Sequence, residues 1–398
     1  MNFKAHLPAV SGMLLITGTS IGAGMLALPV VTGLAGFLPA LAINFICSFF
    51  MMVTGLLFLE AILWSHDGAN VLSLSEHFLG KWGKFVAGVT FLFLYYCLMV
   101  SYFAGGSPAL ASLLSLGTGN PIAAPWNYVL FTGLFGAFVL LGTKAVDRVN
   151  WLLMIGLVLS FLLLIMAGSQ AIQPSLLKRA DWNLSLAAAP ILFGAYGYHN
   201  LLPSLSTYLK RHVNHLRFSI VFGTMIPFVV YSVWQLMIIG TLTLEEIQTA
   251  DLNGEPITQT LQTIVGHPWL ALFGEFFGFF ALVTSFLGVS LSMVDFLGDG
   301  IGIHRRGWNR FFLCVLVFIP PAIFASLHPR VFIEAIGVAG GFGEAILNGL
   351  LPIGMVWVGH HTMGKHMKTP IIGNRGVLLL LTAFTLLIMA VEAYHLLS

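Results

Sequence analysis

The chain has 398 residues, of which 58% are hydrophobic and only 8% are charged, and its formal net charge is +2. Soluble domains carry about 25% charged residues, so lipid must surround most of these apolar side chains. The small net charge excludes a nucleic-acid partner, and the three cysteines have no metal-ligand spacing. The composition predicts an all-α integral membrane protein with a single transmembrane domain over residues 1–398.

Eleven apolar stretches are long enough to cross about 30 Å of hydrocarbon as helices. They fall near 9–37, 39–64, 83–115, 126–143, 149–168, 185–208, 216–240, 268–298, 309–327, 331–357 and 376–396. The connections are short except for 241–267, which we expect to be a structured outer loop. Within it, "ITQTLQTIV" has the pattern of a short amphipathic helix.

The basic residues indicate which side of the membrane each connection faces. With the N-terminus in the cytoplasm, every Lys and Arg except Lys178, Arg179 and Arg330 falls in a cytoplasmic segment. This asymmetry follows the positive-inside rule. It predicts a cytoplasmic N-terminus and, with eleven spans, a periplasmic C-terminus.

The first span contains "GTSIGAGMLALP", residues Gly18–Pro29, with three glycines within seven residues. Gly18 and Gly22 could form a packing seam between helices. A dinucleotide fingerprint is excluded because no strand or βαβ unit flanks the glycines. The third interpretation is a helix that breaks at Gly22-Ala23-Gly24 and leaves backbone groups free at mid-membrane depth. Such groups are tolerated only where they line a cavity or bind a ligand.

The sixth span contains a similar interruption, "PILFGAYGYHNLLP", with Gly194 and Gly197 near its middle. Interrupted helices in matching positions of two halves are typical of a transporter binding site. Spans one to five (9–168) and six to ten (185–357) would be the two halves, with 376–396 as an extra helix. Because each half has an odd number of spans, the two halves would be inverted relative to each other.

The segments "GTSIGAGMLALP", "GYHNLLP" and "TSFLGVSLSMVDFLGDG" resemble those of the bacterial aromatic amino acid permeases. These tyrosine- and tryptophan-specific transporters belong to the amino acid/polyamine/organocation superfamily. The resemblance implies a LeuT-type 5+5 inverted repeat with discontinuous first and sixth helices, in a bacterial inner membrane. It also implies secondary active import of aromatic amino acids by proton symport, without a cofactor or an obligatory protein partner.

An amino acid is a zwitterion, and two broken helices suit one. The half-helix that begins near Met25 would present N–H groups to the carboxylate. The half-helices that end near Ile21 and Phe193 would present carbonyl groups to the ammonium. A β-branched residue at Gly24 would fill the space that the ligand needs.

The resemblance places the substrate site on both broken segments, at Gly22, Ala23, Gly24, Gly194, Ala195, Tyr196 and Gly197. We add Met25 and Phe193, which flank the breaks, and Tyr102 of the third span, which could stack on an aromatic substrate. In a chain with 13% aromatic residues, most such rings simply fill the bundle.

Ionisable or hydroxyl groups within spans are candidates for ion coupling. In sodium-coupled members of the LeuT-type fold, hydroxyls of the eighth span bind sodium, and Thr284 or Ser285 matches that position. Hydrogen bonding of these hydroxyls to their own helix is the simpler explanation. Glu275 on the same span is a further candidate. The fifth span has no lysine to replace an ion, so we expect a proton to drive uptake, with sodium as the alternative.

Two acids of the tenth span, Glu334 and Glu344, flank "IGVAGGF". With Gly337 and Gly341 they form one stripe at helical spacing, which predicts that both carboxylates face the bundle. They are candidate proton carriers, or they hydrogen-bond to a neighbouring helix. His199 follows the break in the sixth span and could relay a proton or serve in packing.

Other functions fit the sequence less well. An intramembrane enzyme would need a nucleophile–base pair or metal ligands on facing helices, and no such motif is present. A channel would need a filter or a charged pore ring, and we identify neither. The remaining alternative is a sodium-coupled transporter of other neutral amino acids.

Overall fold

The computed structural model describes residues 3–120, 122–264, 268–304, 306–367 and 372–397, and every regular element in these ranges is a helix. This confirms the predicted all-α class. Two predictions from the sequence lie partly outside these ranges. Residues 265–267 of the predicted outer loop are not described, and neither are Arg305 and Lys368, which are predicted to be cytoplasmic.

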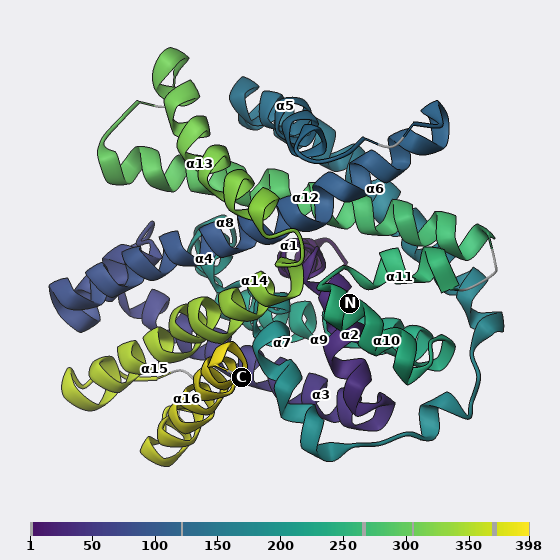
Figure 1. The fold of residues 1–398 in the computed structure, drawn as a ribbon. Coiled ribbons are helices and arrows are strands. Elements are labelled where there is room, and N and C mark those ends of the chain that lie inside the picture. The colour runs from purple at the N-terminus through teal and green to yellow at the C-terminus, as the bar shows by residue number, and fades with distance from the viewer. Residues whose placement is uncertain (1–2, 121, 265–267, 305, 368–371, 398) are drawn as a thin grey trace.

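The long helices follow the predicted spans. They are α3 (Phe37–Trp64), α4 (Val71–Thr118), α5 (Trp126–Leu141), α6 (Thr143–Gly168), α9 (Val213–Thr241), α12 (Pro268–Ile301), α13 (Gly307–Leu327) and α16 (Arg375–Leu397). The short 3-10 helices η1 (Ser169–Ala171), η2 (Leu176–Lys178) and η3 (Trp182–Ala188) follow α6. Figure 1 shows this connection running along the edge of the molecule before the chain turns inward.

The first predicted span is a broken helix. The helices α1 (Phe3–Ser20) and α2 (Gly24–Ala35) are separated by residues 21–23, and the two segments Pro8–Ser20 and Gly24–Ala35 are bent by 63°. The sixth span is broken into α7 (Ala189–Ala195), η4 (His199–Leu201) and α8 (Leu202–Tyr208). Both predicted discontinuities are therefore present.

The count of eleven spans is not confirmed. In the part of the chain that the structure describes, eight helices are long and apolar enough to cross a membrane, or nine if the bent pair α1–α2 counts as one span. The apolar helix α5 is shorter than the others, and each piece of the sixth span is too short to qualify alone. Eleven stays a prediction.

The tenth predicted span is continuous but not uniformly α-helical. It consists of α14 (Phe332–Val338), a π-helix η5 (Ala339–Leu350), α15 (Leu351–Val356) and a second π-helix η6 (Trp357–Thr362). At Gly340 the π-helix lies against the backbone of α7. A Cβ atom at this position would lie only 2.5 Å from the amide nitrogen of Gly194. Glycine is needed for this approach.

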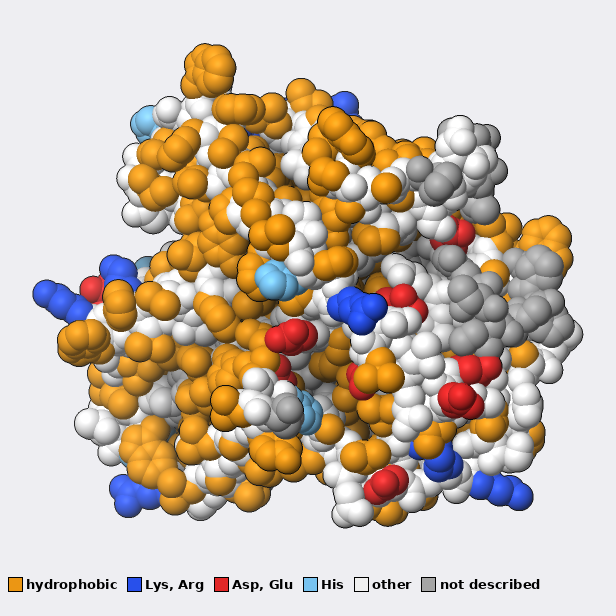
Figure 2. Space-filling model, in the orientation of Figure 1, with side chains coloured by type: hydrophobic (Ala, Val, Ile, Leu, Met, Phe, Trp, Pro, Cys, Tyr) orange, Lys and Arg blue, Asp and Glu red, His pale blue; other side chains and the backbone are white. Residues whose placement is uncertain are grey.

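The long loop after α9 contains α10 (Leu244–Asn253) and α11 (Ile257–Ile264), and α11 is the amphipathic helix expected there. α11 packs on α12, where Gly278 faces Thr258. Figure 1 shows α10 and α11 beside α2, and Figure 2 shows acidic side chains over that part of the same face. Apolar side chains cover most of the remaining surface in this view, as expected for a surface in lipid.

Candidate functional site

The first break is in contact with α12. The amide nitrogen of Ala23 donates a hydrogen bond to the Ser285 hydroxyl over 3.0 Å. A Cβ atom on Gly22 would lie 2.5 Å from the same oxygen, so α12 approaches the unwound residues as closely as glycine allows. Ser285 therefore binds one of the backbone groups that the break exposes.

The second break, residues 196–198, faces an acid. A Cβ atom on Gly197 would fall on the carboxylate of Glu344, which lies in the π-helix η5. The Asn348 amide donates a hydrogen bond to the other oxygen of this buried carboxylate. Glycine is required at position 197 because the acid occupies the place of a side chain.

One tyrosine of α9 connects the two breaks. The Tyr231 hydroxyl lies 2.6 Å from the carbonyl oxygen of Ser20, the last residue of α1, and 2.9 Å from that of Ala195, the last residue of α7. Carbonyls at helix C-termini have no intrahelical donor, and a hydroxyl carries one hydrogen to share between them. One turn along α9, the Trp234 indole donates to the Met25 carbonyl over 2.9 Å.

The two broken helices also touch directly. A Cβ atom on Gly24 would lie 3.0 Å from the Cα atom of Ala195. A larger residue at Gly24 would therefore push α2 away from α7 before it filled any ligand space. The sequence predicted that Gly24 leaves room for the ligand, whereas the structure shows that it leaves room for α7. Gly18 has no atom within 4 Å of a Cβ position, so the packing seam between Gly18 and Gly22 is wrong.

A buried cavity of about 110 Å³ opens beside the second break. Four of the predicted site residues line it: Tyr102, Gly194, Gly197 and Glu344. The remaining lining residues are Thr19, Phe91, Leu94, Tyr95, Leu98, Asn200, Val289, Leu347 and Asn348. The cavity thus combines aromatic rings, one carboxylate and two amide side chains.

The other predicted substrate residues do not line this cavity. They are Gly22, Ala23, Gly24, Met25, Phe193, Ala195 and Tyr196. The Tyr196 hydroxyl donates to Asn44 over 2.7 Å, and the Phe193 ring stacks on Phe50 with centroids 4.9 Å apart. Both side chains hold the second break against α3 and point away from the cavity.

The predicted coupling residues are not gathered in one place. Thr284 donates to the Phe280 carbonyl of its own helix over 2.8 Å, as in the simpler explanation, whereas Ser285 contacts the first break. The buried His199 lies 3.0 Å from the Thr54 hydroxyl through Nε2. Glu275 lines a different cavity beside α11.

The predicted acidic stripe of the tenth span is wrong. Glu334 is exposed, whereas Glu344 is buried and faces the second break. The glycines between them, Gly337 and Gly341, instead face Glu392 of α16. The stripe assumed regular α-helical spacing, and the π-helix from Ala339 has wider turns that rotate the following residues to another face.

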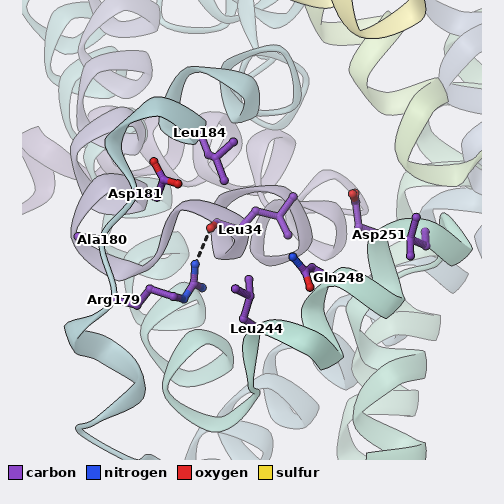
Figure 3. Close-up of a pocket in the computed structure, with 9 residues that line it drawn as sticks. Leu34, Arg179, Ala180, Asp181, Leu184, Leu244, Gln248 and Asp251 are labelled. Atoms are coloured by element: carbon purple, nitrogen blue, oxygen red, sulfur yellow. Dashed lines mark hydrogen bonds between the residues drawn. The ribbon is translucent and has the colours of Figure 1, made fainter. Parts of the chain in front are cut away.

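A larger cavity of about 610 Å³ lies at the other end of α2. Figure 3 shows Arg179 turned toward the end of this helix, where it donates to the Leu34 carbonyl over 2.5 Å. Asp251 of α10 also lines the cavity, and burial raises the pKa of its carboxyl. Because Arg179 caps the far end of α2 and residues 21–23 and 196–198 of the two breaks do not line this cavity, it is not our candidate site.

With this geometry in view, the comparisons with known proteins are informative. Residues 7–392 match the tryptophan/tyrosine permease family. The chain belongs to this family. It is therefore a multi-pass membrane transport protein and not an enzyme.

The relatives with similar sequences are named for different substrates. The chain is 34% identical over 359 residues to tyrosine-specific transport system 1 of Haemophilus influenzae, which covers 87% of each chain. It is 30% identical over 340 residues to a tryptophan-specific transport protein of Pseudomonas aeruginosa, covering 83% of this chain and 82% of that one. It is 29% identical over 345 residues to glutamine transporter 2 of Aliivibrio fischeri, covering 85% of each.

A solved structure shares the fold. The crystal structure of the Eremococcus coleocola manganese transporter, in complex with an aromatic bis-isothiourea substituted compound, superposes with a TM-score of 0.58. The alignment covers 98% of this chain and 86% of that chain at 15% identity. This likeness and the two broken helices confirm the predicted LeuT-type fold, and the likeness implies nothing about substrate.

Among the residues of the site that sequence reasoning missed are Asn44, Asn200, Tyr231, Trp234 and Asn348. Tyr231 and Trp234 stand at i, i+3 spacing on α9 and so share one face. That spacing could have singled them out, but aromatic residues are too common in this chain for it to stand out. The Glu344–Asn348 pair at i, i+4 could have been found in the same way.

Proposed function

We propose that this protein imports aromatic amino acids, with tyrosine as the main substrate and tryptophan or phenylalanine as related ones. Import would occur across a bacterial inner membrane by proton symport with alternating access, with the N-terminus cytoplasmic and the C-terminus periplasmic. The observation that carries the proposal is the cavity lined by Tyr95, Tyr102, Glu344 and the second break. The names of the tyrosine- and tryptophan-specific relatives support the substrate class.

The substrate carboxylate would bind amide groups at the start of α2. Gly24 does not itself line the cavity, but it lies against Ala195, the chain neighbour of the lining residue Gly194. The first N–H groups of a helix lack intrahelical partners and favour an anion. The amides of Gly22 and Gly24 are the ones we assign to the carboxylate, because that of Ala23 is bound by Ser285.

The substrate ammonium would lie near the second break. The carbonyl oxygens of Ser20 and Ala195 accept from Tyr231, and each retains a second lone pair. The aromatic ring would then contact Tyr95 and Tyr102, whose side chains line the opposite wall on α4.

The coupling proton would be carried by Glu344. Among the described residues that line the cavity, this is the only acid. Asn348 binds one of its oxygens, while the other faces the backbone of Gly197. A carboxylate that is neutralised when protonated, beside a moving helix break, can link protonation to a change of conformation.

Sodium coupling with another neutral amino acid is the second candidate. Two observations favour it: the Ser285 hydroxyl lies at the first break, and one relative is named a glutamine transporter. Against it, Ser285 already accepts from Ala23 and Thr284 is bonded to its own helix. Neither hydroxyl therefore offers sodium a ready-made oxygen cage.

Thermal unfolding of the purified protein tests the substrate and the ion together. A ligand that binds only the folded state raises the melting temperature, and the rise grows with the logarithm of the ligand concentration divided by its Kd. We expect tyrosine, tryptophan or phenylalanine to raise it in sodium-free buffer, while glutamine leaves it unchanged. Stabilisation by glutamine alone, or only in the presence of sodium, would favour the second candidate.

A further inference from the structure

A second polar cavity lies on the predicted outer side, between the end of α4, the α10–α11 turn and the start of α12. Two adjoining hollows of about 290 and 350 Å³ form it, and both are lined by Pro108, Glu255, Pro256 and Gln259. Because they share these walls, we treat them as one space and name it the outer groove.

A buried acid without a partner lines this groove. The Glu275 side chain is only 6% exposed, and its Oε1 atom has no hydrogen-bond donor among the described residues. An unpaired carboxylate is strongly unfavourable away from water unless it binds a proton or a positively charged group. The groove therefore contains an acid that either a proton or a positively charged group would stabilise.

Further groups in the groove have matching chemistry. The Glu255 carboxylate lines both hollows and accepts from Thr260 over 3.3 Å. Arg330 lines the hollow that lacks Glu275. The Gly254 backbone packs against the Arg330 carbonyl, which fixes the arginine beside the α10–α11 turn. The groove thus has the Glu275 carboxylate in one hollow, the Arg330 guanidinium in the other, and the Glu255 carboxylate in the wall that both hollows share.

The outer groove and the cavity beside the second break, called the inner cavity below, are both lined by residues of α4. Tyr102 of α4 lines the inner cavity, and Pro108 of α4 lines the groove, about 9 Å further along at 1.5 Å per residue. Between them the Phe103 ring packs on Phe286, with centroids 5.2 Å apart, and Phe286 packs on Phe131 at 4.9 Å. These three rings form an aromatic cluster beside the stretch of α4 that runs from one space to the other.

We propose that the outer groove binds the zwitterionic amino acid before it reaches the cavity beside the second break. Glu275 and Glu255 would bind the ammonium, and Arg330 would bind the carboxylate. Phe279 and Leu282 line the same hollow as Glu275 and offer apolar surface to the side chain. This proposal rests on the proposed function, in that the substrate is an amino acid that arrives from the outer side.

The test combines binding stoichiometry with transport. Tyrosine is titrated into purified wild-type protein, Glu275→Gln and Glu344→Gln, and tyrosine uptake is measured in proteoliposomes. We expect two binding events per chain in the wild type and one in Glu275→Gln. For uptake, we expect Glu275→Gln to raise the KM about ten- to hundred-fold, as loss of a charge-assisted hydrogen bond would, and to leave kcat nearly unchanged.

The matched control is Glu245→Gln, because Glu245 is an exposed acid of α10 that lines neither hollow. We expect wild-type stoichiometry and KM from it. Two analogues add a chemical check: tyramine lacks the carboxylate, and 4-hydroxyphenylpropionate lacks the ammonium. Both should lose the Glu275-dependent binding event.

Three outcomes would overturn the outer site. The first is one tyrosine per wild-type chain and an unchanged KM in Glu275→Gln, which would make Glu275 a structural, protonated acid. The second is stabilisation of the wild type by sodium alone, lost in Glu275→Gln, with a single tyrosine bound, which would make the groove a metal-ion site. The third is equal effects of Glu245→Gln and Glu275→Gln. Failure of the proposed function is distinct, because wild-type protein would then accumulate no tyrosine at all.

Discussion

The two helix breaks look alike in the sequence but differ in what holds them. At the first break, protein groups already bind the exposed backbone: Ser285 accepts from Ala23, and Tyr231 donates to the end of α1. At the second break, the backbone of Gly197 faces the Glu344 carboxylate and the inner cavity. Hydrogen bonds hold both breaks, since Tyr231 also donates to Ala195 and Tyr196 donates to Asn44, but only the second break is adjacent to the acid that lines the cavity.

This difference indicates that the two breaks serve different purposes. Unwound backbone within a membrane must be satisfied by protein, water or ligand. The first break obtains most of its partners from α9 and α12, so it can hold the substrate carboxylate in a fixed position. The second break has an ionisable partner, so its surroundings change with protonation. Tyr231 donates to the helix ends at both breaks, so α9 connects the two breaks directly.

The largest effect is expected from Gly197→Ala, which puts a methyl group on the Glu344 carboxylate. Overpacking of this kind costs about 1–3 kcal/mol, so we expect tyrosine uptake to fall roughly ten- to hundred-fold. Gly194→Ala is the matched control in the same wall, since its Cβ would meet its nearest atom at an ordinary 3.4 Å. Equal losses in the two variants would contradict the assigned contact between Gly197 and Glu344.

Glu344→Gln removes the proposed proton carrier and keeps the shape of the side chain. We expect uptake driven by a pH gradient to drop at least about ten-fold, as for loss of a charged hydrogen-bond partner, with exchange of internal for external tyrosine retained. Uptake measured from pH 5 to 8 should rise toward acid in the wild type and be flat in the variant. Glu334→Gln is the control, because that acid is exposed. If the pH profile of wild-type uptake is flat, or if Glu344→Gln leaves that profile unchanged, the Glu344 carboxylate has only a structural role.

Tyr231→Phe removes the hydroxyl shared by the two breaks. It leaves two buried carbonyls without this donor, which costs about 1–3 kcal/mol, so we expect a lower melting temperature and a raised KM for tyrosine. Tyr96→Phe removes a similar bond, from Tyr96 to the Leu316 carbonyl at 2.9 Å, away from both breaks. We expect it to lower stability without changing KM. A changed KM in both variants would show a general loss of packing instead.

The smallest effect is expected at the first break, from Gly18→Ala. A methyl group there meets no atom within 4 Å, so stability and uptake should stay within about 0.5 kcal/mol of the wild type. Gly24→Ala must displace Ala195 of α7 and should destabilise the protein by about 1 kcal/mol or more. The melting temperatures of the two variants test this comparison. A larger drop in Gly18→Ala than in Gly24→Ala would support the packing seam between Gly18 and Gly22 instead.

The breaks were predictable because their cause is local. Glycine pairs in an otherwise apolar helix indicate a discontinuity, and the helix ends observed at Ser20, Gly24 and Ala195 lie within two residues of those expected. The all-α class followed from composition alone. The family followed from the motifs that contain the same glycines.

What faces each break was not predictable, because it depends on the register of distant helices. The π-helix at Ala339–Leu350 turns Glu344 toward Gly197 and leaves Glu334 on the surface, and regular spacing gives no sign of this. The role of Tyr231 depends on packing between α9 and two helix ends far apart in the sequence. A single aromatic residue in an aromatic-rich chain carries no such information.

The most direct test of the account is tyrosine uptake by wild-type protein in sodium-free proteoliposomes, with an inward proton gradient imposed. The account predicts that labelled tyrosine accumulates above its external concentration, that a protonophore abolishes the accumulation, and that Glu344→Gln never shows it. Uptake that requires sodium and ignores the pH gradient would contradict the account and return the coupling site to Ser285 and Thr284.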